Sequence, residues 1–149
     1  MTSSYLVFRL SERFFGVKLL GAIEIVPWRA PRPVPLSYPH IAGLIDYRGT
    51  LYPVIELGRR LGMNKQEPIG FAAGNPEQTN SGQSIILLEE KRTRFGIIVD
   101  VVVKMTTLEE PTMAPETTPG VDPKYVKGIV FEDDQEILIL DFERLLHAS

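Results

Sequence analysis

Short apolar runs, separated by polar or glycine-containing turns, dominate the pattern of the chain. These runs are rich in valine, isoleucine, leucine and aromatic residues, and they cover residues 5–10, 15–20, 44–47, 51–55, 85–89, 95–103, 129–131 and 137–141. Runs of this length and composition, bounded by turn residues, are typical of β-strands. Short helices are expected at 56–61 and at 142–147, where the apolar side chains share one face. The pattern predicts a mainly β protein with short helices.

The two halves of the chain resemble each other. A shift of 85 positions lays 126–130 on 41–45 and 139–146 on 54–61, and a shift of 80 positions lays 84–89 and 95–97 on 4–9 and 15–17. Alternating strands can be slid into register by chance, but the paired glycines Gly43 and Gly128 favour a true repeat of 5–62 and 84–147. Both glycines, like Gly49, are expected to be structural turn residues. A unit of about 60 residues is marginally stable alone. We therefore expect two small β-barrels that share a central core within one domain, residues 1–149.

Two segments lie outside this pattern. Residues 64–82 are polar and rich in glycine, proline and asparagine, so we expect a flexible linker between the repeats. Residues 106–123 contain several prolines and are expected to form an extended crossover, in the place that 27–39 occupies in the first repeat. The run 31–35, Pro-Arg-Pro-Val-Pro, fits either a polyproline ligand or a stiff connection, and the stiff connection is favoured.

Composition narrows the choice of partners and compartment. The chain has 16 Lys and Arg against 19 Asp and Glu, so no basic field favours nucleic acid. It has no cysteine, which excludes disulfides and thiolate metal sites and is compatible with a reducing cytosol. Neither a signal peptide nor an apolar run long enough to cross a bilayer is found, so a cytoplasmic protein without direct membrane insertion is expected.

Catalytic signatures are missing from the sequence. His40 and His147 have no partner at a spacing typical of a metal pair or a general base. Asp133 and Asp134 lie where a hairpin is expected to turn, and acidic residues are common there because they bond the local backbone. A metal site would need more carboxylates than the neighbouring glutamates supply. The sequence predicts no enzyme, no metal site and no cofactor.

Residues 43–57 stand out as a hairpin that presents a charge. Two apolar strand segments flank a turn that contains Arg48, and Gly49 can supply the positive φ that a tight turn needs. The segment resembles the signature of the CheW family, the coupling proteins of bacterial chemosensory arrays, which looks like Gly-x-x-Asn-x-Arg-Gly-x-x-x-Pro-Val-x-x-Leu. The chain departs from it at Asp46 and matches it at Gly43, Arg48, Gly49, Pro53, Val54 and Leu57.

The resemblance extends over nearly the whole chain, through residues 5–10, 23–26, 95–100, 125–128 and 137–141. It implies two five-stranded SH3-like β-barrels and a non-catalytic adaptor. One barrel would contact the regulatory domain of a CheA-type histidine kinase, and the other could contact a second kinase subunit. A groove between the barrels would receive the cytoplasmic tip of a methyl-accepting chemoreceptor. The alternatives are an adaptor of a non-flagellar pathway, for pili or second messengers, and a small-ligand-binding double β-barrel.

Five residues are candidates for partner binding. The fork of Arg48 suits a partner carboxylate, although a solvated turn charge is the other explanation; the resemblance favours binding. Asp46 lies two positions away on the same strand face, so it could approach Arg48 and partly neutralise it. Glu24, within an apolar run, either guards a sheet edge or contacts a partner. Val99 and Val101 belong to a strand with valine on both faces, which fits either the core or an interface.

Overall fold

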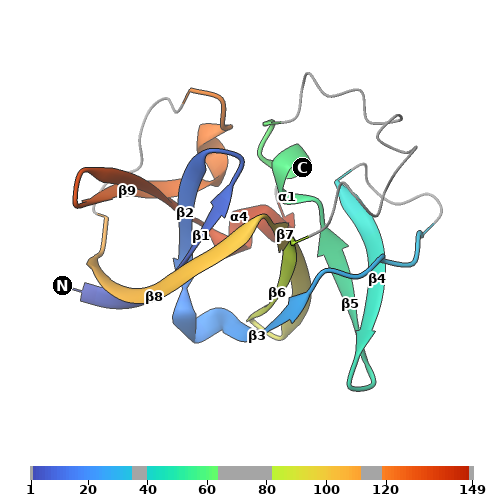
Figure 1. Cartoon of the computed structure of the whole chain (residues 1–149). Helices are drawn as coiled ribbons and strands as arrows, with labels where there is room; N and C mark the ends of the chain where they lie inside the picture. The colour runs from blue at the N-terminus through green and yellow to red at the C-terminus, as the bar shows by residue number, and fades with distance from the viewer. Residues whose placement is uncertain (1, 35–39, 64–81, 112–118, 148–149) are drawn as a thin grey trace.

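Two five-stranded sheets make up the fold. The computed structural model describes residues 2–34, 40–63, 82–111 and 119–147 (Figure 1). Sheet A has the strand order β8 (Val101–Glu109), β1 (Thr2–Leu10), β2 (Arg13–Lys18), β10 (Gln135–Leu140), β9 (Val126–Glu132). Sheet B has the order β3 (Ala22–Pro27), β6 (Ser84–Glu90), β7 (Thr93–Val99), β5 (Thr50–Ile55), β4 (Ile41–Tyr47). The predicted mainly β architecture is confirmed, while the closure of each sheet into a barrel stays a prediction.

Each sheet contains strands from both halves of the chain. The first half supplies β1 and β2 to sheet A and β3, β4 and β5 to sheet B, and the second half supplies the complementary set. The parallel pairing of Val54 with Gly96 in sheet B has its equivalent in the pairing of Ile139 with Gly16 in sheet A. The halves therefore exchange strands instead of forming one sheet each.

Two α-helices and two 3-10 turns complete the described part of the chain: α1 (Leu57–Arg60), α4 (Phe142–His147), η1 (Leu19–Gly21) and η2 (Pro123–Tyr125). Both α-helices lie where the sequence predicts them. They begin alike, because Glu56 Oε1 accepts a hydrogen bond from the Arg59 amide at 3.4 Å and Asp141 Oδ1 accepts one from the Arg144 amide at 3.2 Å. Such side-chain acceptors satisfy amides that have no partner within a helix.

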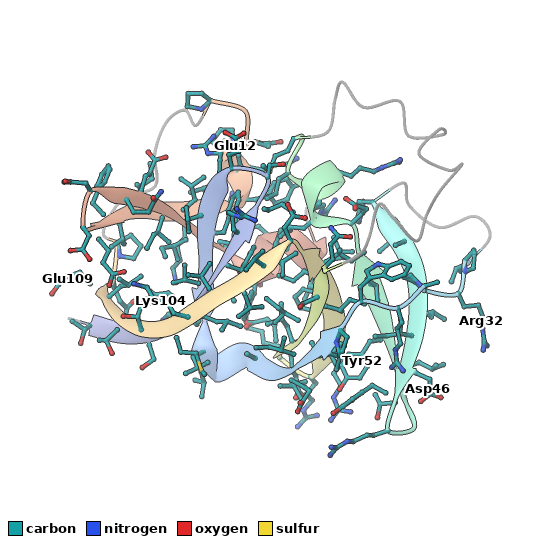
Figure 2. All side chains as sticks on the ribbon, viewed as in Figure 1. Glu12, Arg32, Asp46, Tyr52, Lys104 and Glu109 are labelled. Atoms are coloured by element: carbon teal, nitrogen blue, oxygen red, sulfur yellow. The ribbon has the colours of Figure 1, made fainter. Side chains whose placement is uncertain are left out.

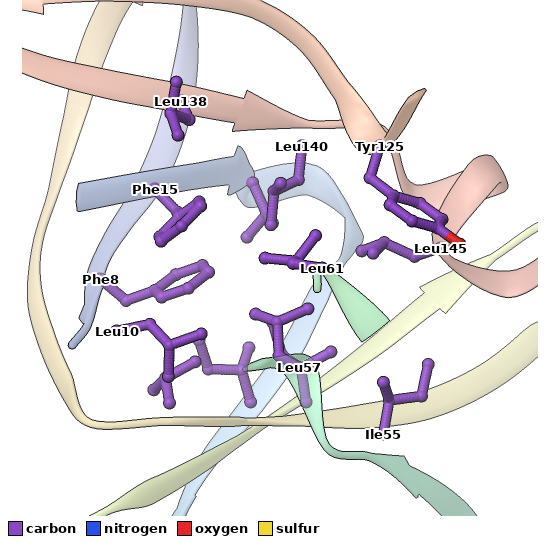
Figure 3. Close-up of a cluster of buried hydrophobic side chains, with 14 of the residues drawn as sticks. Phe8, Leu10, Phe15, Ile55, Leu57, Leu61, Tyr125, Leu138, Leu140 and Leu145 are labelled. Carbon is purple, nitrogen blue, oxygen red and sulfur yellow. The ribbon is translucent and has the colours of Figure 1, made fainter. Parts of the chain in front are cut away.

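A shared hydrophobic core joins the two sheets and both helices. Figure 3 shows part of it, where the rings of Phe8 and Phe15 stack with centroids 5.7 Å apart near Leu57 and Leu61. Each sheet also has a smaller cluster of its own, around Tyr52 in sheet B and Tyr5 in sheet A. The central strands β1 and β6 are buried on both faces, which explains their unbroken apolar runs.

The prediction of one strand over 95–103 is wrong. The chain bends at Asp100, where it leaves β7 in sheet B and enters β8 in sheet A. The Asp100 carboxylate holds this bend: Oδ2 accepts from the Ser11 amide at 2.7 Å, and Oδ1 accepts from Gln83 Nε2 at 2.9 Å. Strand β8 then continues to Glu109, so the predicted crossover over 106–123 begins later than expected. The predicted linker over 64–82 lies almost entirely outside the described residues.

Gly43 and Gly128 lie within strands and not in turns. Each glycine is next to a β-bulge, and the two bulges are equivalent. In the β4–β5 pair the register shifts between Ile41 and Gly43. In the β9–β10 pair Gly128 lies opposite Ile139 and Val126 lies opposite Leu140, so the register shifts between these two pairs. Gly43 has a φ of 151°, and a Cβ there would lie 2.3 Å from the carbonyl oxygen of Arg32. The glycine is therefore needed for the close approach of another backbone segment. The prediction of these two glycines as turn residues is corrected accordingly.

Candidate functional site

The β4–β5 hairpin presents Arg48 at its tip, and Figure 1 shows this hairpin projecting from sheet B. Arg48 and Gly49 form the two-residue connection, with φ of 53° and 82°. Positive φ at both central residues is typical of the tight turns whose twist matches that of the flanking strands. For arginine this conformation costs about 1 kcal/mol, whereas glycine adopts it freely. The turn thus holds a charged side chain at a strained position.

Asp46 stabilises the turn and does not pair with Arg48. Its Oδ1 accepts a hydrogen bond from the Gly49 amide at 3.0 Å. The Arg48 guanidinium carbon instead lies 5.2 Å from the centroid of the Tyr47 ring, and no ion pair joins Asp46 and Arg48. The predicted partial neutralisation of Arg48 is therefore wrong. Asparagine, with the same acceptor oxygen, would serve the turn equally well.

A crossover segment, residues 28–34, lies along the outer edge of β4 beside this hairpin. Arg32 and Leu44 exchange two backbone hydrogen bonds, of 2.8 and 2.9 Å, and the missing side chain of Gly43 makes room for this contact. Arg29 Nη2 donates to the Asp46 carbonyl. Figure 2 shows Arg32 and Asp46 at the same end of the molecule, opposite Glu109. The crossover therefore adds two arginines beside Arg48.

Glu24 lies in the middle of β3, at the edge of sheet B. Its side chain is exposed, and so are those of Ile23 and Ile25 on either side. An exposed, apolar edge strand invites pairing with other chains, and a charge on it opposes this. The position fits both roles considered from the sequence, edge protection and partner contact.

Val99 and Val101 lie on either side of the bend at Asp100, Val99 at the end of β7 and Val101 at the start of β8. Val99 is fully buried in the shared core, so the prediction that it contacts a partner is corrected. Val101 is 40% exposed and begins a row on β8 that continues with Val103 and Met105, which is 64% exposed. Val103 and Met105 are not among the candidates predicted from the sequence, although alternate apolar residues on an edge strand are a recognisable signal.

A groove of about 370 Å³ is lined by residues of both sheets, beside η1 and α4. Leu20 on its rim is 96% exposed, which is unusual for a large apolar side chain. Its walls are charged, with lysines from sheet A and carboxylates from β6, from α4 and from the residue that precedes α4. These lining residues are Lys18, Lys127, Glu89, Glu90, Asp141 and Glu143. An amphipathic segment that carries charges of both signs would fit this groove.

Shifted pKa values occur at structural positions. Burial raises the pKa of the Glu56 carboxyl, and the backbone hydrogen bond from Arg59 opposes this only in part. Burial, and next the Arg60 charge, lowers the pKa of His40. In the described ranges no group of three or more His, Cys, Asp or Glu side chains is placed to hold a metal ion. No helix in the described part of the chain has the length and hydropathy to cross a bilayer.

Comparison with known proteins agrees with this architecture. The structure is similar to the crystal structure of the scaffolding protein TtCheW from Thermoanaerobacter tengcongensis, with a TM-score of 0.81. The sequences of the two proteins are 27% identical, and the match covers 100% of this chain and 90% of that one. It is 26% identical to a probable chemotaxis protein CheW of Rhizobium etli, over 97% of this chain and 87% of the relative.

A chemotaxis protein CheW of Treponema pallidum is 23% identical, over 95% of this chain and 81% of its own length. The sequence model of the CheW-like domain matches residues 4–149. The match therefore includes both sheets, the shared core and the arginine hairpin. On this basis the chain belongs to the CheW-like domain family.

Proposed function

We propose that the protein is a cytoplasmic, non-catalytic adaptor that couples methyl-accepting chemoreceptors to a CheA-type histidine kinase. The observation that carries this proposal is Arg48, displayed on a projecting hairpin in a chain of the CheW-like family. Its guanidinium contacts only the Tyr47 ring among the described residues, so its five N–H donors remain for a partner.

The positive φ of Arg48 is shared by the hairpin-tip residues Lys91, Arg92, Asp133 and Asp134, so the side chain and not the backbone angle distinguishes Arg48. Glycine or asparagine would fit a positive φ at lower cost, so the arginine brings no benefit to the turn itself. The Asp46 hydrogen bond to the Gly49 amide and the β4–β5 pairing hold the turn, and with it the backbone of Arg48, in place. A guanidinium held in this way suits a carboxylate on the regulatory domain of the kinase.

A second surface is proposed for the receptor. The groove beside η1 and α4, with Leu20 on its rim, and the exposed row Val101, Val103 and Met105 on β8 offer apolar contacts. An amphipathic helical tip would bury such side chains and pair its charges with the walls of the groove. Glu24 on the exposed edge β3 is proposed as a further contact. Separate surfaces would allow both partners to bind at once.

The proposed mechanism is assembly without chemistry in the adaptor. Two modest interfaces on one rigid body raise the effective concentration of the second partner once the first is bound. The shared core between the sheets makes the body rigid, because residues of both sheets pack into one cluster. A change in the receptor would then reach the kinase as a change in relative position, and the adaptor would recruit the kinase to membrane-associated receptor arrays.

Reconstitution with the co-encoded receptor fragment and kinase tests this proposal. We expect a ternary complex and a change in kinase autophosphorylation that depends on the adaptor. Each partner should also bind the adaptor in the absence of the other. A mixture in which no ternary complex forms and autophosphorylation does not change would contradict the adaptor role.

A further inference from the structure

The crossover segment and the β4–β5 hairpin enclose a second pocket, of about 280 Å³. The crossover forms one wall and strands β4 and β5 form the other. The lining residues are Arg29, Ala30, Arg32, Leu44, Ile45, Asp46 and Leu51. The pocket is adjacent to the turn that carries Arg48, so one partner surface can reach both.

The arginines of this pocket have few internal contacts. Arg32 uses its backbone to pair with Leu44, and its exposed side chain has no hydrogen bond or ion pair with another described residue. Arg29 donates one hydrogen bond, to the Asp46 carbonyl. A guanidinium has five N–H donors in a planar fork. Most of the donors around the pocket are therefore open to a ligand.

The charge at this end of the molecule is positive. Arg29 and Arg32 line the pocket and Arg48 is on the adjacent turn. Among the described lining residues Asp46 alone has a carboxylate, and one of its oxygens is already bonded to the Gly49 amide. The pocket also has an apolar side, since Leu51 is 57% exposed. A complementary ligand would therefore combine carboxylates with an apolar side chain.

We propose that this pocket binds a second carboxylate of the partner that Arg48 contacts, and that Arg29 and Arg32 are specificity-determining residues. This inference rests on the proposed adaptor function and adds the chemistry of the partner. The partner surface has two carboxylates, one for Arg48 and one for the pocket, with an apolar side chain between them that covers Leu51. Arg32 binds its carboxylate through charge-assisted hydrogen bonds. Arg29 supplies further N–H donors to the same carboxylate, and its hydrogen bond to the Asp46 carbonyl also holds the crossover against β4.

A second copy of the chain fits this pocket less well than another protein. The opposite end of the molecule is acidic around the β9–β10 hairpin, but much of that charge is already neutralised. Three of its carboxylates form ion pairs within the chain: Glu132 with Lys104, Glu136 with Arg13, and Glu110 with Lys18. Carboxylates that are already paired gain little from a new partner cation. A separate acidic partner is therefore favoured.

Binding of the full chain to the co-encoded kinase and to the receptor fragment, by titration calorimetry, tests the pocket. Arg32→Ala keeps both backbone hydrogen bonds to Leu44, so its melting temperature should match that of the wild type. We expect it to weaken binding to the partner of Arg48 about tenfold. Binding should also depend less steeply on salt concentration, which a purely structural role would not change.

Arg94→Ala is the matched control. It also removes one exposed arginine from sheet B, where Arg94 forms only a surface pair with Glu89 at 3.8 Å. We expect it to change affinity less than twofold. If Arg32→Ala binds as tightly as Arg94→Ala while Arg48→Glu binds weakly, the pocket proposal is overturned and the adaptor proposal stands.

Two further outcomes are decisive. The first is a wild-type protein that sediments as a dimer in the absence of partners, together with an Arg32→Glu variant that sediments as a monomer. This result would show that the pocket binds a second copy and would overturn the proposal of a separate acidic partner. A wild-type chain that binds neither the kinase nor the receptor fragment would reject the adaptor function, and the pocket proposal with it.

Discussion

Ile139 on β10 lies opposite Gly16 on β2, in the parallel pair that joins strands from the two halves of the chain. A Cβ on Gly16 would lie 3.0 Å from Ile139 Cδ1, closer than ordinary van der Waals contact. Sheet B has the corresponding parallel pair of Val54 and Gly96, but there a Cβ on Gly96 would lie 3.6 Å from Val54 Cγ2, an ordinary contact, and 3.0 Å from Ile85 Cγ2 on the neighbouring strand β6. Glycine at position 16 therefore allows the strands of the two halves to meet in sheet A, whereas glycine at position 96 makes room for a side chain of β6.

Gly16→Val tests this relationship. The added side chain would overpack the cluster around Ile139 in sheet A, so we expect the free energy of unfolding to fall by about 1–3 kcal/mol. Urea denaturation followed by circular dichroism measures the change. Ile139→Ala alone removes a buried side chain and is also destabilising, but in the double variant the smaller side chain leaves room for the valine, so the loss should be smaller than the sum of the two single losses. Losses that simply add in the double variant would contradict direct packing between the two positions.

Arg48→Gly separates stability from binding. Glycine adopts the φ of 53° without strain, so we expect the variant to be more stable than the wild type by about 1 kcal/mol. The same change removes the guanidinium, so binding to the kinase should weaken at least tenfold. Thermal melting and titration calorimetry measure the two effects.

Arg48→Glu serves as a companion variant, because it reverses the charge and keeps a side chain at the strained position. We expect a native fold and still weaker binding. Loss of folding in Arg48→Glu would indicate a structural role for the arginine. Unchanged binding in Arg48→Gly would reject the arginine as a partner contact.

Local signals predicted most of the strands, both helices and the arginine hairpin, while β3 was not among the predicted runs and β7 and β8 were predicted as one. Alternating apolar residues, turn glycines and short apolar faces act within a few residues of each other, so the sequence displays them directly. The exchange of strands between halves is not local, because either sheet would satisfy the same apolar pattern. The bend at Asp100 was missed for a related reason: valine on both sides hides the point at which the chain changes sheets.

The candidate site shows the same limit. Val99 and Val101 look equivalent in sequence, yet only Val101 is exposed, since burial depends on what packs against each face. Asp46 was expected near Arg48 from strand geometry. The turn carries both residues, and the Gly49 amide is a closer partner for the carboxylate than the flexible guanidinium. The arginines of the crossover could be found only once the crossover was seen against β4.

Asp46→Asn is expected to be nearly neutral. The amide oxygen replaces the carboxylate as acceptor for the Gly49 amide, so the free energy of unfolding should change by less than about 0.5 kcal/mol. Asp46→Ala loses this acceptor and should cost about 1 kcal/mol. Because no ion pair joins Asp46 to Arg48, Asp46→Asn should alter partner affinity less than about threefold. A tenfold change in affinity would show that the Asp46 charge is read by the partner.

Glu56 gives stability a defined dependence on pH. Burial raises the pKa of its carboxyl in the folded state, so the folded state holds this proton more tightly than the unfolded state. Stability from this group is therefore fully present below the unfolded pKa and is lost as pH rises through the folded pKa. Glu56→Gln keeps an acceptor for the Arg59 amide and cannot ionise, so it lacks this loss.

We therefore expect Glu56→Gln to gain stability relative to the wild type between pH 4 and pH 7, with unfolding measured by urea at each pH. Comparing the two proteins at the same pH cancels the contributions of the other titrating groups to the free energy of unfolding. His40 is one of these groups: its pKa is lowered in the folded state, so its contribution to stability is lost as pH falls, opposite to that of Glu56. Glu56→Ala, which removes both the charge and the acceptor, should show the same trend from a lower starting value. A difference between wild type and Glu56→Gln that stays constant across this range would contradict a raised pKa at Glu56.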